Sequence, residues 1–194
     1  MDVQISRGFT STERSEVGVL YWEAFGSKLI AAFPDEETGS GLVTAGLHPE
    51  HVLVARAGSE VAGVCGFNED GVGAVDMTWA LLRTRLSPIR SLWAAIVLSI
   101  LARGDQPGVL VLDGICVRRE CRGLGIGSRL LSAAAVVAGE RGDAHVQLSV
   151  ISTNPRAEAL YLRSGFEITN DAALGPLRHL FGFDRYATLR RTLS

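Results

Sequence analysis

Three glycines at alternate positions separate an apolar stretch from a helical pattern in the segment RGLGIGSRLL, which starts at Arg122. The stretch before it, Val109 to Val117, is almost wholly apolar, which is typical of a strand covered on both faces. The pattern after it keeps apolar residues on one helical face until Gly139 and Gly142. A strand, a glycine loop and a helix in this order bring backbone N–H groups and the positive end of a helix dipole together. This arrangement favours an anion such as a phosphate.

Two common nucleotide-binding loops do not fit this segment. A P-loop requires a lysine and then a serine or threonine after its last glycine, whereas Ser128 and Arg129 follow Gly127. A dinucleotide-binding fingerprint starts directly after its strand and has a third glycine three residues beyond the second. Here residues 118–122 intervene, and Ser128 stands in the third place. The spacing therefore supports neither nucleotide fold.

The rest of the chain alternates between strand and helix patterns. Residues 3–7 alternate as a short strand, and residues 13–32 carry apolar side chains at helical spacing. Two apolar runs around Gly58-Ser59 predict an antiparallel hairpin over about 51–67. Downstream, a strand pattern starts at His145, and Asn154-Pro155 opens a second helix. The segment FGFDRYATLRR supplies a final strand.

Residues 70–108 predict a mostly helical insertion and not a second domain. A glycine-rich turn opens the insertion, Ser87-Pro88 interrupts its helical part, and RGDQPG ends it. Its longest apolar run, Leu92 to Ala102, is about half of the ~20 residues that a membrane-spanning helix requires. We therefore expect a buried or lid helix and no membrane partner. Since 194 residues can bury one sizeable core, we expect a single domain over 1–194.

Charge and cysteine content narrow the partners and the compartment. A net charge of −2 provides no polybasic surface for a nucleic-acid backbone, so nucleic acid is not expected as a partner. Cys65, Cys116 and Cys121 lack C-x-x-C spacing, which argues against a zinc site or a disulfide framework. The first residues, MDVQISRGFT, show no secretory signal. These features together predict a cytoplasmic protein.

The glycine segment resembles the acetyl-CoA-binding motif R/Q-x-x-G-x-G/A of the GNAT family of N-acetyltransferases. A second match lies at the family's expected distance downstream, in NPRAEALYLRSGF, which fits the pattern N-x-x-A-x-x-L-Y-x-x-x-G-F. The ordered pair makes the resemblance specific over about 109–168, whereas residues 1–68 match only by the order of their elements. Residues 70–108 depart from the family, which usually joins its third and fourth strands by a short turn. The matched residues of the second motif are Asn154, Ala157, Leu160, Tyr161, Gly165 and Phe166.

The resemblance implies a mixed α/β fold with a central, mostly antiparallel twisted sheet flanked by helices. It also implies an acyl-CoA-dependent N-acetyltransferase that transfers an acetyl group from acetyl-CoA to a primary amine by direct attack in a ternary complex, without a metal. In this interpretation loop amides wrap the pyrophosphate, and unpaired strand groups bind the pantetheine arm. Asn154 could contact that arm, cap a helix, or do both. The implied cofactor-binding residues are Ile115, Cys116, Val117, Arg122, Gly123, Leu124, Gly125, Ile126, Gly127, Ser128 and Asn154.

Two residues are the implied catalytic groups. Tyr161 stands where the family places a general acid that protonates the departing thiolate, although a tyrosine packed on the sheet is the alternative. Asp113 stands where the family often carries a glutamate base, with a structural hydrogen bond as the alternative. A backbone N–H near Cys116 or Val117 would stabilise the oxyanion. A covalent route through Cys116 or Cys121 is disfavoured, because a strand cysteine is usually a small buried apolar residue.

The sequence does not identify the acceptor amine, which can be a small molecule or a peptide. Asp35, Glu36 or Glu37 could attract a cationic amine or form a solvated loop, and His179 is a secondary acid–base candidate. Two other functions stay open: a CoA-binding sensor without turnover, and an acyltransferase for longer acyl chains with residues 92–102 as a wall. The resemblance also allows a homodimer.

Overall fold

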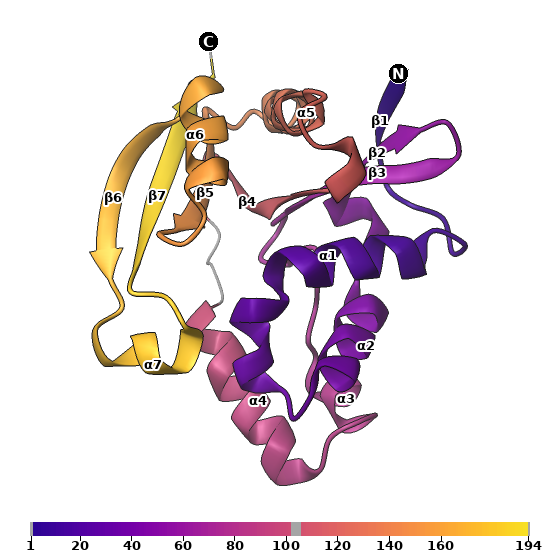
Figure 1. Cartoon of the computed structure of the whole chain (residues 1–194), viewed down its shortest axis with the longest axis vertical. Coiled ribbons are helices and arrows are strands. Elements are labelled where there is room, and N and C mark those ends of the chain that lie inside the picture. Colours follow the sequence, from indigo (N-terminus) through magenta and orange to yellow (C-terminus); the bar gives the residue numbers. More distant parts are fainter. Residues whose placement is uncertain (1, 102–105, 194) are drawn as a thin grey trace.

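The computed structural model describes residues 2–101 and 106–193, which form one seven-stranded sheet flanked by helices (Figure 1). The strand order is β1-β2-β3-β4-β5-β7-β6. The pair β4 and β5 is parallel, and the other neighbouring strands in this order are antiparallel. The expected mixed α/β fold with a mostly antiparallel sheet is confirmed.

The first third of the chain supplies one edge of the sheet and two helices. The expected strand, helix and hairpin correspond to β1 (Val3–Arg7), α1 (Arg14–Leu29), β2 (Val52–Ala57) and β3 (Glu60–Phe67). The helix α2 (Glu36–Gly46) was not foreseen, because its internal glycines weaken helix propensity. Those glycines serve packing: a Cβ on Gly39 would lie 2.4 Å from a ring atom of Trp22. Short 3-10 turns follow α1 at Ile30–Ala32 and precede β2 at Pro49–His51.

The segment between β3 and β4 contains α3 (Trp79–Arg83) and α4 (Pro88–Leu101), so the expected helices and their break at Ser87-Pro88 are confirmed. The expectation that α4 is buried holds for one face only. Ala94 and Val97 are buried, whereas Leu92, Trp93 and Ile96 are about half exposed, since α4 packs on the molecule from one side. Ala102, the end of the expected apolar run, lies outside the described residues. Within the described ranges, no helix is both long and apolar enough to cross a membrane.

The second half of the chain follows the expected order closely. The long apolar strand, the helix after the glycine loop, the strand from His145 and the helix opened by Asn154 are all confirmed, while β6 had no assigned range. The elements are β4 (Val109–Val117), a 3-10 turn at Arg119–Cys121, α5 (Ile126–Glu140), β5 (His145–Ile151), α6 (Pro155–Arg163), β6 (Glu167–Ala173), a 3-10 turn at Gly175–Leu177, α7 (Arg178–Phe181) and β7 (Arg185–Thr192).

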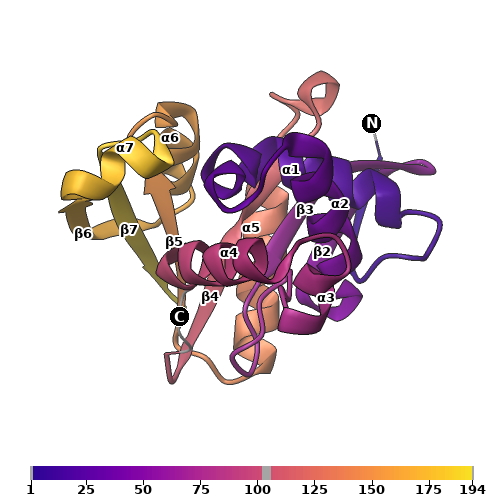
Figure 2. The same cartoon turned by 90° about the horizontal axis from the view of Figure 1, so that it is seen from below.

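The two faces of the sheet are covered by different helices. Along β2, Val52 and Val54 join one apolar cluster with α1, α2 and α4, while Leu53 and Ala55 join another with α5 and α6. This is the two-residue alternation of a strand with both faces buried. Figure 2 shows α4 lying across the same side of the sheet as α1. The insertion therefore adds to the layer formed by α1 and α2.

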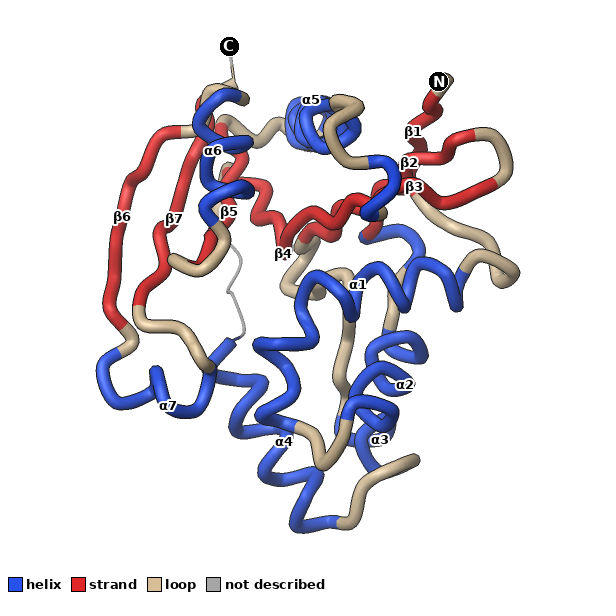
Figure 3. Tube along the Cα trace, in the orientation of Figure 1, coloured by secondary structure: helices blue, strands red, loops and turns tan. Residues whose placement is uncertain are grey.

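Two irregularities of β4 create the space for a site. β4 pairs with β5 only from Val109 to Val111, and beyond this point the strands diverge (Figure 3). On the other side of β4, Gly66 of β3 faces Gly114 while Phe67 faces Leu112. Asp113 is thus the extra residue of a β-bulge, a device that redirects a side chain out of the regular ladder.

Candidate active site

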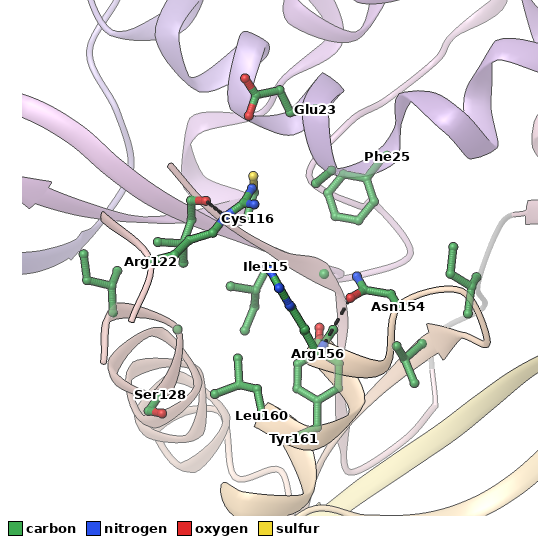
Figure 4. Close-up of a pocket in the computed structure, with 18 of the residues that line it drawn as sticks. Glu23, Phe25, Ile115, Cys116, Arg122, Ser128, Asn154, Arg156, Leu160 and Tyr161 are labelled. Atoms are coloured by element: carbon green, nitrogen blue, oxygen red, sulfur yellow. Dashed lines mark hydrogen bonds between the residues drawn. The ribbon is translucent and has the colours of Figure 1, made fainter. Parts of the chain in front are cut away.

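A cavity of about 640 Å³ opens where β4 and β5 separate (Figure 4). Its walls come from the ends of β4 and β5, the glycine loop, the first turn of α5, α6 and one face of α1. We call it the first cavity. Of the residues expected to bind a cofactor, those that line it are Ile115, Cys116, Val117, Arg122, Gly123, Gly125, Ile126, Gly127, Ser128 and Asn154. Leu124 is the exception: its side chain is 53% exposed and does not line the cavity.

The glycine loop keeps one side open to the first cavity. Gly123 and Gly125 have φ values of +80° and +75°, a region that glycine enters without strain. A Cβ on either residue would meet no other heavy atom within 4 Å, so open space lies beside this backbone. Gly125 is the N-cap of α5, and the first N–H groups of a helix have no partner within it. Loop and helix together offer the donors and the dipole that a diphosphate requires.

Gly127 has a different function from the two loop glycines. A Cβ at this position would lie 2.8 Å from Cδ2 of Leu160, so glycine allows the start of α5 to approach α6 closely. The two sequence motifs, one on each helix, are therefore in direct packing contact along one wall of the first cavity.

Arg122 ties the loop to β4. Its Nε donates a hydrogen bond to the carbonyl oxygen of Val117 at 3.0 Å. Figure 4 shows its side chain extending along β4 toward Cys116, beneath Glu23 of α1. In the structure Arg122 therefore caps the glycine loop through the carbonyl of Val117, and it also lines the first cavity.

The edge of β4 that faces the first cavity can be assigned from its hydrogen bonds. The amide of Arg118 donates to the carbonyl of Ala62 on β3 at 2.9 Å. Successive residues of a strand point their backbone groups to opposite sides, so those of Val117 and Ile115 point away from β3 and into the gap. Cys116, which pairs with Val64, directs its backbone toward β3. Of the two residues proposed to stabilise an oxyanion, Val117 has the suitable orientation.

The cysteine thiols on the central strands are poor nucleophiles. Burial, reinforced by the carboxylate of Glu23, raises the pKa of the Cys116 thiol to about 11, and Arg122 opposes this rise only in part. Burial likewise raises the pKa of Cys65, with a smaller contribution from Asp113. Since the thiolate is the reactive form, both residues are largely protonated near neutral pH.

Tyr161 and Asn154 lie on the same wall, at α6. The Tyr161 side chain is 5% exposed, and its ring lies 6.2 Å from that of Phe166. Figure 4 shows its hydroxyl directed into the first cavity. The side-chain oxygen of Asn154 accepts a hydrogen bond from the amide of Ala157 at 3.2 Å, so Asn154 caps α6 and also lines the cavity.

Asp113 projects from the bulge toward α1. Its Oδ2 accepts hydrogen bonds from the amide of Ala74 at 2.8 Å and from the hydroxyl of Tyr21 at 3.2 Å. The structural hydrogen bond considered for this residue therefore exists, and it fixes the orientation of the carboxylate. Because both bonds end on Oδ2, neither occupies Oδ1.

A second cavity of about 450 Å³ adjoins the first. It is lined by α1, by residues 68–77 of the segment after β3, and by α4. Phe25, Lys28 and Asp113 line both cavities. Phe25 packs against the bulge, where a Cβ on Gly114 would lie 2.5 Å from its ring. Residues 70–101 of the insertion thus contribute walls to the candidate site.

Several site residues were not foreseen from the sequence. Glu23, Phe25 and Lys28 lie on α1, and the helical periodicity gave no sign of which face meets a cavity. Arg156 and Arg163 of α6 also line the first cavity, and Figure 4 shows Arg156 extending toward Ile115. Arg156 directly follows Asn154-Pro155, so the second motif could have pointed to it.

The other residues considered for acceptor binding or acid–base chemistry lie outside both cavities. Asp35 caps α2 by accepting a hydrogen bond from the amide of Thr38, which lowers the pKa of its carboxyl group. Glu36 accepts a hydrogen bond from Nε1 of Trp22 at 2.9 Å. His179 lies in α7 and accepts a hydrogen bond from Nε of Arg178. None of these residues, nor Glu37, lines either of the two cavities.

Metal ligation has no support among the described residues, where no group of three or more histidine, cysteine, aspartate or glutamate side chains is placed to hold an ion.

A family model described as the acetyltransferase (GNAT) family matches residues 16–166. No curated protein sequence matches the chain. Among solved structures, a protein called SsHAT is 20% identical, with a TM-score of 0.65 over 99% of this chain and 98% of its own. An acetyltransferase of Bacillus subtilis, solved in complex with CoA, is 17% identical, with a TM-score of 0.63 over the full length of both chains. An IAA acetyltransferase from Bacillus cereus is 18% identical, with a TM-score of 0.57 over 99% of this chain and 100% of its own. These likenesses show the fold.

Proposed function

Since the chain belongs to the acetyltransferase (GNAT) family, we propose that it transfers an acetyl group from acetyl-CoA to a primary amine, with direct attack of the amine in a ternary complex. We also infer that residues 1–194 act as one domain, because α4 of the insertion packs in the same apolar cluster as α1. The observation that carries the proposal is the first cavity, where an open glycine loop meets a helix N-terminus and an unpaired strand edge.

The first cavity fits an acyl-CoA along its length. The amides of residues 123–128 would hold the diphosphate, and Arg156 and Arg163 add positive charge to the same cavity. The backbone groups of Ile115 that point into the gap would pair with the amide groups of the pantetheine arm. The carbonyl of Val117 already accepts a hydrogen bond from Arg122, so Val117 offers its N–H to the thioester end of the cofactor. The related Bacillus subtilis protein was solved with CoA, which supports this assignment. When bound, acetyl-CoA supplies an acetyl group activated as a thioester.

The acceptor would reach the thioester from the second cavity, across the boundary formed by Phe25, Lys28 and Asp113. The amine nitrogen forms a bond to the carbonyl carbon, and the bond from that carbon to sulfur breaks. Asp113, or a water that it orders, accepts the amine proton, and the N–H of Val117 stabilises the charge that develops on the carbonyl oxygen. Tyr161 donates a proton to the sulfur as it leaves.

The raised pKa of the Cys116 thiol supports direct attack over a covalent acyl-cysteine route. Near neutral pH only a very small fraction of this thiol is ionised, so it offers little nucleophile for the thioester. The groups assigned to direct attack all line the first cavity: Asp113, Val117 and Tyr161. This route requires no covalent intermediate.

The experiment that tests this function measures free thiol released from acetyl-CoA in the presence of a panel of primary amines, with mass spectrometry of the acetylated product. We expect release above the hydrolysis rate for at least one amine, in proportion to product. Acetyl-CoA binding without thiol release for any amine would contradict the proposal and favour the sensor function. Replacing acetyl-CoA by hexanoyl-CoA tests the remaining alternative, a longer acyl donor.

A further inference from the structure

The second cavity has mostly apolar walls. Side chains of α1, of the segment after β3 and of α4 form them, including Leu29, Val72, Val75, Met77, Ala95 and Leu98. A volume of about 450 Å³ lies within the range of small-molecule pockets, roughly 300–1,000 Å³. Apolar walls stabilise a ligand in proportion to the apolar surface that it removes from water.

Within residues 2–101 and 106–193, the charged groups that line this cavity are few and their signs nearly balance. They are the ammonium group of Lys28 and the carboxylates of Asp76 and Asp113. Two carboxylates and one ammonium leave a single negative charge in excess, which matches one cationic group on a ligand. Asp76 already lies 3.9 Å from Nε2 of His48, whereas the hydrogen bonds of Asp113 to Ala74 and Tyr21 both end on Oδ2, so its Oδ1 is the atom that would meet the ligand.

A second cation on the ligand would be poorly placed. Except at Asp76, which already faces His48, it would lie against mostly apolar side chains, where an unpaired charge is costly to desolvate. Near the boundary it would also meet Lys28, whose Nζ lies 5.8 Å from the centre of the Phe25 ring. Amines with several positive charges, such as polyamines, therefore fit this cavity worse than monoamines of the same length.

We infer that the acceptor is a primary amine carried on an uncharged apolar body, an alkyl or arylalkyl amine, with its nitrogen at Asp113 and its body against α4. This inference rests on the proposed function and specifies its substrate class. The insertion then determines acceptor specificity, because Ala95, Leu98 and Ser99 of α4 line the cavity that holds the body.

The test compares kcat/KM across n-alkylamines from ethylamine to hexylamine, and compares hexylamine with 1,6-diaminohexane. We expect kcat/KM to rise about fourfold for each buried methylene group. We expect the diamine to be roughly tenfold or more worse than hexylamine, since its second cation must be desolvated. A flat series, or a preference for the diamine or a polyamine, would overturn the inference while leaving the acetyltransferase function standing. If no amine in either series raised thiol release above the hydrolysis rate, both the inference and the acetyltransferase function would be overturned.

Variants of α4 test whether the preference for longer alkylamines depends on the second cavity. Ala95→Phe fills it and should reduce kcat/KM for hexylamine far more than for ethylamine, with no change in the thermal shift produced by acetyl-CoA. Ser99→Phe adds bulk from an exposed position and serves as a second variant should the first fail to fold. The matched control is Ile96→Phe on the same helix, since Ile96 is 50% exposed and lines neither cavity. Equal losses in all three variants would contradict the assignment of this cavity.

Discussion

The two cavities that meet at Asp113 are built from different kinds of group. The first cavity depends on backbone: glycines at positive φ, the N-terminus of α5 and the free edge of β4. The second depends on side chains from α1, residues 68–77 and α4, which are far apart in the sequence. Backbone groups suit a cosubstrate that many related enzymes share, whereas side chains can change with the acceptor. Cofactor and acceptor specificity can therefore vary separately in this chain.

The largest effect is expected from Tyr161→Phe, which removes a hydroxyl from the first cavity and keeps the buried ring. We expect kcat to fall by about 10²–10⁴-fold, the usual contribution of a general acid, while acetyl-CoA binding is retained. The measurement is kcat against pH with the best amine of the panel. An unchanged rate across the pH range would show that Tyr161 only packs against Phe166.

Asp113→Asn tests the residue that both cavities share. An asparagine oxygen can accept the same bonds from Ala74 and Tyr21, so the fold should be kept. We expect turnover to fall by about 10²-fold or more through loss of the base, with the acetyl-CoA thermal shift unchanged. Full activity in this variant would leave Asp113 as a structural link between β4 and the insertion.

Gly114→Ala should disturb the boundary between the cavities. Gly114 has φ +153°, and its new Cβ would lie 2.5 Å from Cζ of Phe25, so the ring must move. We expect a loss of about 1–3 kcal/mol in the free energy of unfolding, measured in urea, together with altered amine preference. The control is Gly142→Ala, where φ is +77° but no atom lies near the new Cβ. Its cost should be about 1–2 kcal/mol of backbone strain, with no change in amine preference.

The smallest effect is expected from Glu13→Gln, which lies outside both cavities. Hydrogen bonds from Arg56, and then from the amide of Thr10, lower the pKa of Glu13 from 4.5 to about 2. A lowered pKa stabilises the fold above the unfolded value of 4.5, and this stabilisation is lost as the pH falls toward 2.

At neutral pH we expect Glu13→Gln to lower the free energy of unfolding by about 1–2 kcal/mol, and the difference from the wild type to shrink as the pH falls from 4.5 toward 2. Urea unfolding at several pH values measures this. Acetyl-CoA affinity should not change, so the variant separates stability from binding. A difference that is independent of pH would contradict the role of the pair with Arg56.

The sequence predicted what depends on local backbone geometry. The bounds of β4 and the cap at Asn154 follow from an apolar run and helix signals, and the resemblance of 109–168 to the family's two motifs implied many residues that line the first cavity. The sequence did not predict α2, because the glycine that weakens this helix in isolation is required by Trp22, a residue on another helix. For the same reason it missed Phe25 and Lys28, whose place between the cavities is set by packing of α1 against the bulge.

Thermal unfolding with and without acetyl-CoA, for the wild type, Gly125→Asp and Gly125→Asn, tests the central claim most directly. At a ligand concentration ~100 times the dissociation constant, binding adds about 2.7 kcal/mol and should raise the midpoint by roughly 5–10 °C. The asparagine variant should keep most of this shift, because it has the same shape as aspartate without the charge. The aspartate variant should lose the shift, since a carboxylate would face the diphosphate. No shift in the wild type at saturating acetyl-CoA would contradict the assignment of the first cavity.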